Sequence, residues 1–194
     1  MVSSPGLWFL LAGYLVIAIF LVIQRVLRRT ESARTLRRGA FDRGSTLLIG
    51  GAFGFAVVAP IIMYALGYAV SSLDLLEGFV GLIVMGSGLG LRVWATLTLG
   101  RYYTGTLMIL EDHKVVSEGP YSVVRHPGYL GDILLWSGFG VISSSLVLVV
   151  LFPAMFAIVY AYRISVEERM LVRELWDGYV QYQKRTRKII PLVY

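Results

Sequence analysis

The chain has 194 residues, a formal net charge of +6 and a composition that is 57% hydrophobic without a single cysteine. This apolar share exceeds that of an ordinary soluble domain, so a membrane is the predicted solvent; the basic residues gather beside apolar runs, where they meet lipid headgroups rather than nucleic acid. The lack of cysteine excludes disulfides, thiolate metal sites, cysteine nucleophiles and lipidated cysteine anchors.

Three apolar runs, residues 7–23, 45–70 and 78–99, each suit one transmembrane helix, which needs about 20 residues. The first run lacks the basic start and the cleavage site of a signal peptide, so we predict a retained span. A single charge, Arg92, interrupts the third run, and such a charge either points inward to a partner or snorkels to the nearby interface. Small residues four positions apart predict close approach between spans. These pairs are Gly50 with Gly54 and Gly86 with Gly90.

The fourth apolar run, residues 129–162, is too long for one ordinary span, and the serines at 143–145 offer a turn in its middle. Basic residues precede the run at Lys114 and Arg125 and follow it from Arg163 onward. Because basic residues favour the cytoplasmic side, both ends of the run belong there. A tight helical hairpin meets this requirement, whereas a single crossing does not.

The loop after the first span is rich in arginine, while the next loop, around Asp74 and Glu77, has no Lys or Arg. We therefore predict an all-α, multi-pass integral membrane protein with five transmembrane helices, its N-terminus outside and its C-terminus cytoplasmic. We expect residues 1–194 to form a single membrane domain, with three spans in 1–100 and a polar loop, the hairpin and a C-terminal helix in 101–194. The arginines of the first loop are Arg25, Arg28, Arg29, Arg34, Arg37, Arg38 and Arg43.

A polar segment, residues 101–127, joins the third span to the hairpin and contains both histidines, His113 and His126. Loops of this length are usually functional or disordered, and the apolar side chains in this one argue against disorder. Pro127 suits the first turn of the following helix, so free backbone amides there face the loop. Such a helix end favours an anionic or carboxylate group.

A second polar cluster follows the hairpin, where Arg163, Glu167 and Glu168 lie on one continuous helix. Arg163 and Glu167 are four positions apart and share a face, which predicts an interfacial ion pair. Two adjacent carboxylates also leave one of them available to a ligand ammonium. Both interpretations remain open from the residues alone.

From Met170 onward the apolar residues follow helical spacing, which predicts a C-terminal amphipathic helix that rests on the interface or folds back over the loop. The two histidines and few carboxylates match no known metal spacing, so no metal site is predicted. A strand–turn–helix dinucleotide fingerprint is also absent.

The segments 119–131, 163–168 and 179–191 together resemble the isoprenylcysteine carboxyl methyltransferase family. They contain Gly-Pro-Tyr, Arg-His-Pro-x-Tyr-x-Gly, an arginine followed by Glu-Glu, and a tyrosine-rich basic tail. The match covers about the last half of the chain, and the first spans match in hydropathy alone. The resemblance implies a membrane methyltransferase that uses S-adenosyl-L-methionine, releases S-adenosylhomocysteine and works at the cytoplasmic face.

The same resemblance implies roles for particular residues. Arg163 occupies the position associated with the substrate carboxylate and is the candidate catalytic residue, and Glu167 matches the acid that holds the cofactor's ammonium. The implied acceptor is lipophilic and enters sideways from the bilayer between spans, and we expect a monomer. The implied cofactor-binding residues are His113, Lys114, Val115, Val116, Tyr121, His126, Pro127, Gly128, Tyr129 and Glu167.

Three other functions remain open. A phospholipid N-methyltransferase acts on an amine, which needs deprotonation and gains nothing from Arg163. A membrane sterol reductase that uses NADPH shares a related C-terminal pattern, and the five spans and short N-terminal region argue against it. A non-enzymatic membrane adaptor would not require the Arg-His-Pro and Glu-Glu motifs to converge.

Overall fold

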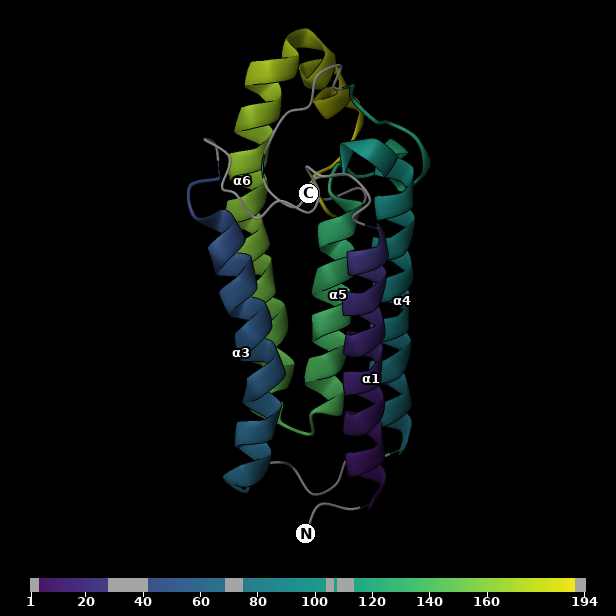
Figure 1. Ribbon diagram of the computed structural model, residues 1–194, viewed down its shortest axis with the longest axis vertical. Helices are drawn as coiled ribbons and strands as arrows, with labels where there is room; N and C mark the ends of the chain where they lie inside the picture. The colour runs from purple at the N-terminus through teal and green to yellow at the C-terminus, as the bar shows by residue number, and fades with distance from the viewer. Residues whose placement is uncertain (1–3, 28–41, 69–74, 104–106, 108–113, 191–194) are drawn as a thin grey trace.

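The computed structural model describes residues 4–27, 42–68, 75–103, 107 and 114–190. Long helices dominate this part of the chain, and consecutive ones run in opposite directions through an elongated bundle (Figure 1). The all-α prediction is therefore confirmed for the described residues. The long helices are α1 (Ser4–Leu27), α3 (Ser45–Ala65), α4 (Leu75–Leu99), α5 (Pro127–Ile142) and α6 (Leu146–Arg185), with short 3-10 turns η1 (Gly100–Tyr102) and η2 (Gly119–Ser122).

Four stretches within the described residues, Gly6–Leu27, Ser45–Ala65, Leu75–Tyr102 and Leu146–Arg185, are long and apolar enough to cross a membrane. The fourth apolar run does form a helical hairpin, with the turn between α5 and α6 at the three serines. However, α5 has only 16 residues, which at 1.5 Å per residue gives roughly 24 Å, less than the hydrocarbon core of about 30 Å. The count of five spans therefore stays a prediction.

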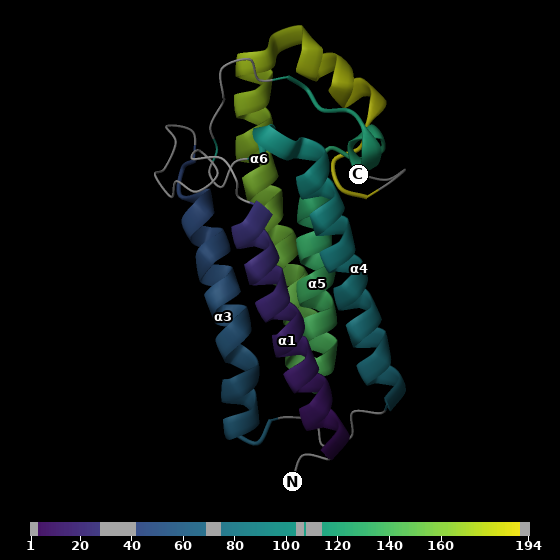
Figure 2. The same ribbon diagram turned by 45° about the vertical axis from the view of Figure 1, so that its right-hand side comes forward.

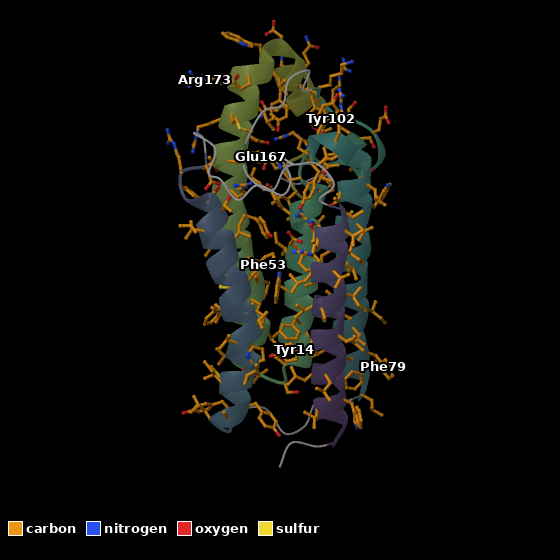
Figure 3. All side chains as sticks on the ribbon, viewed as in Figure 1. Tyr14, Phe53, Phe79, Tyr102, Glu167 and Arg173 are labelled. Atoms are coloured by element: carbon orange, nitrogen blue, oxygen red, sulfur yellow. The ribbon has the colours of Figure 1, made fainter. Side chains whose placement is uncertain are left out.

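The polar segments gather at one end of the bundle. Tyr102, Glu167 and Arg173 lie toward this end, whereas Tyr14 and Phe79 lie toward the other (Figure 3). The start of α5, the end of α4 and the bend of α6 also lie at the first end (Figures 1 and 2). The alternation of helix directions thus brings the two polar clusters of the sequence together.

Glycines let α4 and α5 pack with their backbones close together. A Cβ atom on Gly88 would lie 2.4 Å from the backbone nitrogen of Leu135, and one on Gly138 would lie 2.5 Å from the carbonyl oxygen of Gly81. One on Gly131 would meet the carbonyl oxygen of Gly88 at 2.7 Å. The glycines whose spacing permits close approach do not make this contact, because, outside their own helix backbone, no atom of the described residues lies within 4 Å of a Cβ built on them. Those are Gly50, Gly54, Gly86 and Gly90.

The end of α6 folds back on the bundle. Its helix is interrupted at Trp176, which has φ 45° and ψ −131° and is 75% exposed. Beyond it, the last turns return over the loop that precedes α5 (Figure 2). Tyr182 is buried there, and its hydroxyl donates a hydrogen bond of 2.7 Å to the carbonyl oxygen of Tyr121. Of the two arrangements predicted for the C-terminal helix, the structure has the one that covers the loop.

Candidate functional site

A cavity of about 280 Å³ lies where the polar segments meet, lined by side chains from all five long helices and from the loop before α5. It brings together most of the cofactor-binding residues implied by the family resemblance. Pro127 begins α5 and is not part of the lining. His113 lies outside the described residues. The implied residues that line the cavity are Lys114, Val115, Val116, Tyr121, His126, Gly128, Tyr129, Arg163 and Glu167.

The first turn of α5 is fixed by backbone pairing with the C-terminal tail. The amide of His126 donates to the carbonyl oxygen of Lys188 at 3.0 Å, and the amide of Arg125 donates to that of Arg187 at 2.7 Å. Pro127 then starts the helix, as predicted from its fixed φ and its missing N–H. The His126 ring consequently stacks on the Tyr129 ring, with centroids 5.6 Å apart and planes at 9°.

Glu167 faces the cavity beside these rings. The Tyr129 hydroxyl donates a hydrogen bond of 2.5 Å to Oε2 of Glu167, and no hydrogen bond to Oε1 is formed within the described part of the chain. The Tyr129 ring stacks on that of Tyr160, with centroids 4.7 Å apart. One carboxylate oxygen is therefore presented to a cavity that aromatic side chains also line, and its negative charge suits a cationic ligand.

Glu168, the neighbouring acid, has a structural role. Its Oε1 accepts a hydrogen bond of 2.7 Å from Nε of Arg125 and lies 3.3 Å from Nε2 of His126. Nη1 of Arg125 also donates to the carbonyl oxygens of Gln183 and Thr186, at 3.2 and 2.5 Å. These contacts hold the start of α5, the middle of α6 and the fold-back together.

Arg163 does not form the predicted ion pair with Glu167. Its Nη1 donates to Oδ1 of Asp42 at 2.8 Å and to the hydroxyl of Ser45 at 2.6 Å. Its Nε donates to the Tyr129 hydroxyl at 3.2 Å. Among the described residues Nη2 forms no hydrogen bond, so one nitrogen of Arg163 is available to a ligand.

Asp42 is a site residue that sequence reasoning missed. Burial alone would raise the pKa of its carboxyl group, but hydrogen bonds from Thr46 and Ser45 and the charge of Arg163 outweigh that effect and lower the pKa below its ordinary value of 3.8. The signal in the sequence was an acidic residue next to Arg43 and three positions before the serine that starts α3. It was hidden by the arginines of the first loop.

Arg92 points inward rather than snorkelling. Its Nη1 lies 3.4 Å from Oδ2 of Asp132, and its Nη2 donates to the Tyr103 hydroxyl at 3.0 Å. The Tyr160 hydroxyl donates to the same Asp132 oxygen at 2.6 Å. Gln24 completes this group, since its Oε1 accepts a 2.8 Å hydrogen bond from Tyr103. Sequence analysis identified Arg92 as an outlier but not its partners, although Asp132 is an acid inside an apolar run.

The fold and site define a multi-helix membrane protein with a cavity, lined by both polar and apolar side chains, at one end of its bundle. The model of the "Isoprenylcysteine carboxyl methyltransferase (ICMT) family" matches residues 79–173. Protein-S-isoprenylcysteine O-methyltransferase B of Arabidopsis thaliana is 30% identical over 160 residues, which cover 77% of this chain and 78% of the plant protein. The chain belongs to the isoprenylcysteine carboxyl methyltransferase family, which confirms the family predicted from its motifs.

Two further comparisons agree. Protein-S-isoprenylcysteine O-methyltransferase of Schizosaccharomyces pombe is 28% identical over 160 residues, covering 75% of this chain and 62% of the yeast protein. A solved structure of a eukaryotic intramembrane Ras methyltransferase, ICMT, is 22% identical in sequence and superposes with a TM-score of 0.70. The alignment covers 100% of this chain and 70% of the other. That structure supports the fold.

Proposed function

We propose that this chain is an S-adenosyl-L-methionine-dependent carboxyl O-methyltransferase of the membrane, and that its acceptor is a lipophilic, isoprenylcysteine-like carboxylate. Family membership and the names of the relatives support the reaction class. The observation that carries the proposal is the convergence of Glu167, His126 and Tyr129 on one cavity, although they come from two separate helices.

The residues present fit the methyl donor. S-adenosyl-L-methionine, when bound, supplies the methyl group from a positively charged sulfonium and carries a separate ammonium. Oε1 of Glu167 has no partner among the described residues and is suited to the ammonium. Val115 and Val116 give the cavity an apolar wall.

Arg163 orients the acceptor in this proposal. A carboxylate nucleophile carries no proton that must be removed, so alignment and exclusion of water supply most of the rate acceleration; holding two reactants in line can be worth roughly 7 to 11 kcal/mol. Nη2 of Arg163 would hold one acceptor oxygen. Because Asp42 already partly neutralises the guanidinium, the acceptor carboxylate keeps more of its nucleophilic character.

The acceptor's lipid tail would reach the cavity from the bilayer between α1 and α3. Phe20 and Leu21 of α1 and Ile49 and Phe53 of α3 line the cavity. Leu21 is also 53% exposed on the outer face of the bundle. An apolar tail in this position stays in hydrocarbon while its polar end meets Arg163. We further propose that the enzyme acts as a monomer, with five spans, an external N-terminus and a cytoplasmic active site.

Calorimetric titration of the detergent-purified protein with S-adenosyl-L-methionine tests this proposal. We expect saturable binding, and E167Q should weaken it by roughly 10- to 100-fold, because an amide replaces the carboxylate that faces an ammonium. E174Q is the matched control, since Glu174 is an exposed residue on the same helix. Equal affinities in both variants would refute the role of Glu167.

Methyl transfer is measured with a radiolabelled donor and two acceptors, a farnesylated cysteine carboxylate and an ethanolamine phospholipid. Transfer to the carboxylate is expected. Transfer to the amine alone would identify the protein as a phospholipid N-methyltransferase. Binding of a nicotinamide dinucleotide, without binding of S-adenosyl-L-methionine, would instead favour the reductase.

A further inference from the structure

The outer face of α6 changes from apolar to basic along its length. Ile158 is 71% exposed and Tyr162 38% exposed, so the apolar part of this face points away from the bundle. Ser165 and Arg169 follow on the same face, three and seven positions after Tyr162, and both are exposed. An exposed tyrosine is typical of the edge of the hydrocarbon layer. With a rise of 1.5 Å per residue, Arg169 lies about 10 Å further out, at the level of the lipid headgroups.

An open groove of about 430 Å³ lies on this basic part of α6, between the helix and the C-terminal tail. It is separate from the cavity described above, because the two have no lining residue in common. Arg173, one of its residues, lies toward the polar end of the molecule (Figure 3). The groove is lined by Ser165, Glu168, Arg169, Val172, Arg173, Gln183 and Lys188.

Hydrogen bonds hold the two walls of the groove in place. On the α6 side, Oε1 of Glu168 accepts a hydrogen bond of 2.7 Å from Nε of Arg125. On the tail side, Nη1 of Arg125 donates to the carbonyl oxygen of Gln183 at 3.2 Å, and the amide of His126 donates to that of Lys188 at 3.0 Å. The groove is therefore preformed, and the protein backbone loses little conformational freedom when a ligand binds.

The charge of the groove is positive. Arg169, Arg173 and Lys188 line it together with one acid, Glu168, which is already in an ion pair. Arg169 forms no ion pair or hydrogen bond with the described residues. Arg173 lies 3.8 Å from Glu174, but both side chains are exposed, and such a pair contributes little. Guanidinium groups match the paired oxygens of a phosphate, and a lysine adds a point charge.

We propose that this groove binds the headgroup of an anionic glycerophospholipid, whose acyl chains lie against the apolar part of the same helix face. The basic side chains select a headgroup with a net negative charge, because they repel the cation of a choline headgroup. The apolar surface beside Ile158 and Tyr162 selects a lipid over free phosphate. This inference goes beyond the proposed function, since the groove lies outside the cavity and binds the lipid whatever the methyl acceptor is.

Calorimetric titration of the detergent-purified protein with short-chain lipids tests the inference. The probes are dihexanoyl phosphatidylglycerol, dihexanoyl phosphatidylcholine and inorganic phosphate. The wild-type protein should bind the glycerol lipid at least about tenfold more tightly than either of the others. Equal binding of the two lipids would overturn the inference. Equal binding of inorganic phosphate and phosphatidylglycerol would also overturn it, because the groove would then be a site for free phosphate.

The double variant R169Q/R173Q removes two charges from the α6 wall and should weaken binding of phosphatidylglycerol at least about tenfold. K184Q/R185Q is the matched control, because it removes the same charge from two exposed residues near the end of α6 that do not line the groove. Its affinity for the lipid should change little. An equal loss in the control would overturn the inference by showing that net charge alone attracts the lipid.

K188Q keeps the test decisive if R169Q/R173Q does not fold, because it changes the opposite wall of the groove and leaves the backbone pairing of the tail in place. It should weaken binding of phosphatidylglycerol roughly fivefold. A melting curve establishes that each variant is folded. An unchanged affinity for phosphatidylglycerol in a folded R169Q/R173Q or K188Q variant would overturn the inference.

Discussion

Arg163 is held on two sides by residues that are distant from it in the sequence. Its Nη1 donates hydrogen bonds to Asp42, Ser45 and Thr46, and its Nε donates one to the Tyr129 hydroxyl. The Tyr129 hydroxyl also donates a hydrogen bond to Glu167, so Arg163 and Glu167, the residue proposed to bind the ammonium, share one hydroxyl group. Asp42 therefore acts as a positioning residue whose influence reaches Glu167 through two side chains.

D42N should lower the stability of the folded protein, because it leaves the buried Arg163 guanidinium without its counter-ion. A loss of about 3 kcal/mol is expected, equivalent to a melting temperature lower by roughly 6–12 °C. Thermal unfolding in detergent micelles measures it, and D177N, at an exposed position, is the control.

The effect of D42N should depend on pH. Since the pKa of Asp42 is lowered in the folded protein, its ion pair contributes fully above the ordinary value of 3.8 and is lost as the pH falls through the lower folded value. The difference between D42N and wild type should accordingly shrink below pH 3.8. A difference that stays constant as the pH falls from 3.8 through the lower folded pKa would exclude the ionised carboxylate as its source.

Sequence reasoning identified cavity-lining residues where the motif was local and missed residues that depend on distant partners. The family motif gave His126, Tyr129 and Glu167, and the structure brings all three to one cavity. Asp42 and Gln24 have no such motif, because their meaning comes only from the residues that face them across helices. The sequence correctly placed Arg163 on the same helix face as Glu167. It predicted an ion pair between them because Glu167 is the nearest acid in the sequence, whereas the actual partner is Asp42.

At the level of elements, the seam between α4 and α5 sets the site. Gly88 and Gly131 allow the two backbones to touch, and this places Arg92 of α4 against the first turn of α5. Hydropathy predicted the helices and the serine turn correctly. It could not show which glycines form the seam, because glycine spacing alone does not say which face of a helix meets a neighbour.

Replacing Gly88 should therefore damage the fold, whereas the same change two residues away should not. G88A puts a Cβ 2.4 Å from a backbone nitrogen of α5, which must shift. We expect a loss of at least about 2 kcal/mol and weaker binding of S-adenosyl-L-methionine. G86A meets open space and should be neutral or slightly stabilising, since alanine favours a helix more than glycine does. Equal melting temperatures for the two variants would contradict a close backbone contact between α4 and α5 at Gly88.

For the molecule as a whole, the described charges are distributed unevenly between the two ends of the bundle. Arg25 and Arg43 adjoin helix ends near the cavity, whereas Glu77 lies in the first turn of α4 at the opposite end. Because basic residues are retained in the cytoplasm, the cavity should face that side. The sequence predicts this orientation, and the alternation of helices agrees with it.

The absence of native cysteine allows a direct test of orientation. A cysteine introduced by Y68C, at an exposed position beyond α3, should react with a membrane-impermeant maleimide in intact cells. One introduced by D177C, on the fold-back of α6, should react only after permeabilisation. The reverse pattern would place the cavity outside.

The length of α6 links the site to the thickness of the surrounding bilayer. Phe152 and Phe156, deep in the bundle, belong to the same helix as Arg163 and Glu167, in the part of α6 that precedes the interruption at Trp176. Its partner in the hairpin, α5, is short, so lipids of different chain length change the tilt of one helix against the other. We therefore expect a change in bilayer thickness to alter the contact between Glu167 of α6 and Tyr129 of α5, and with it the rate of methyl transfer.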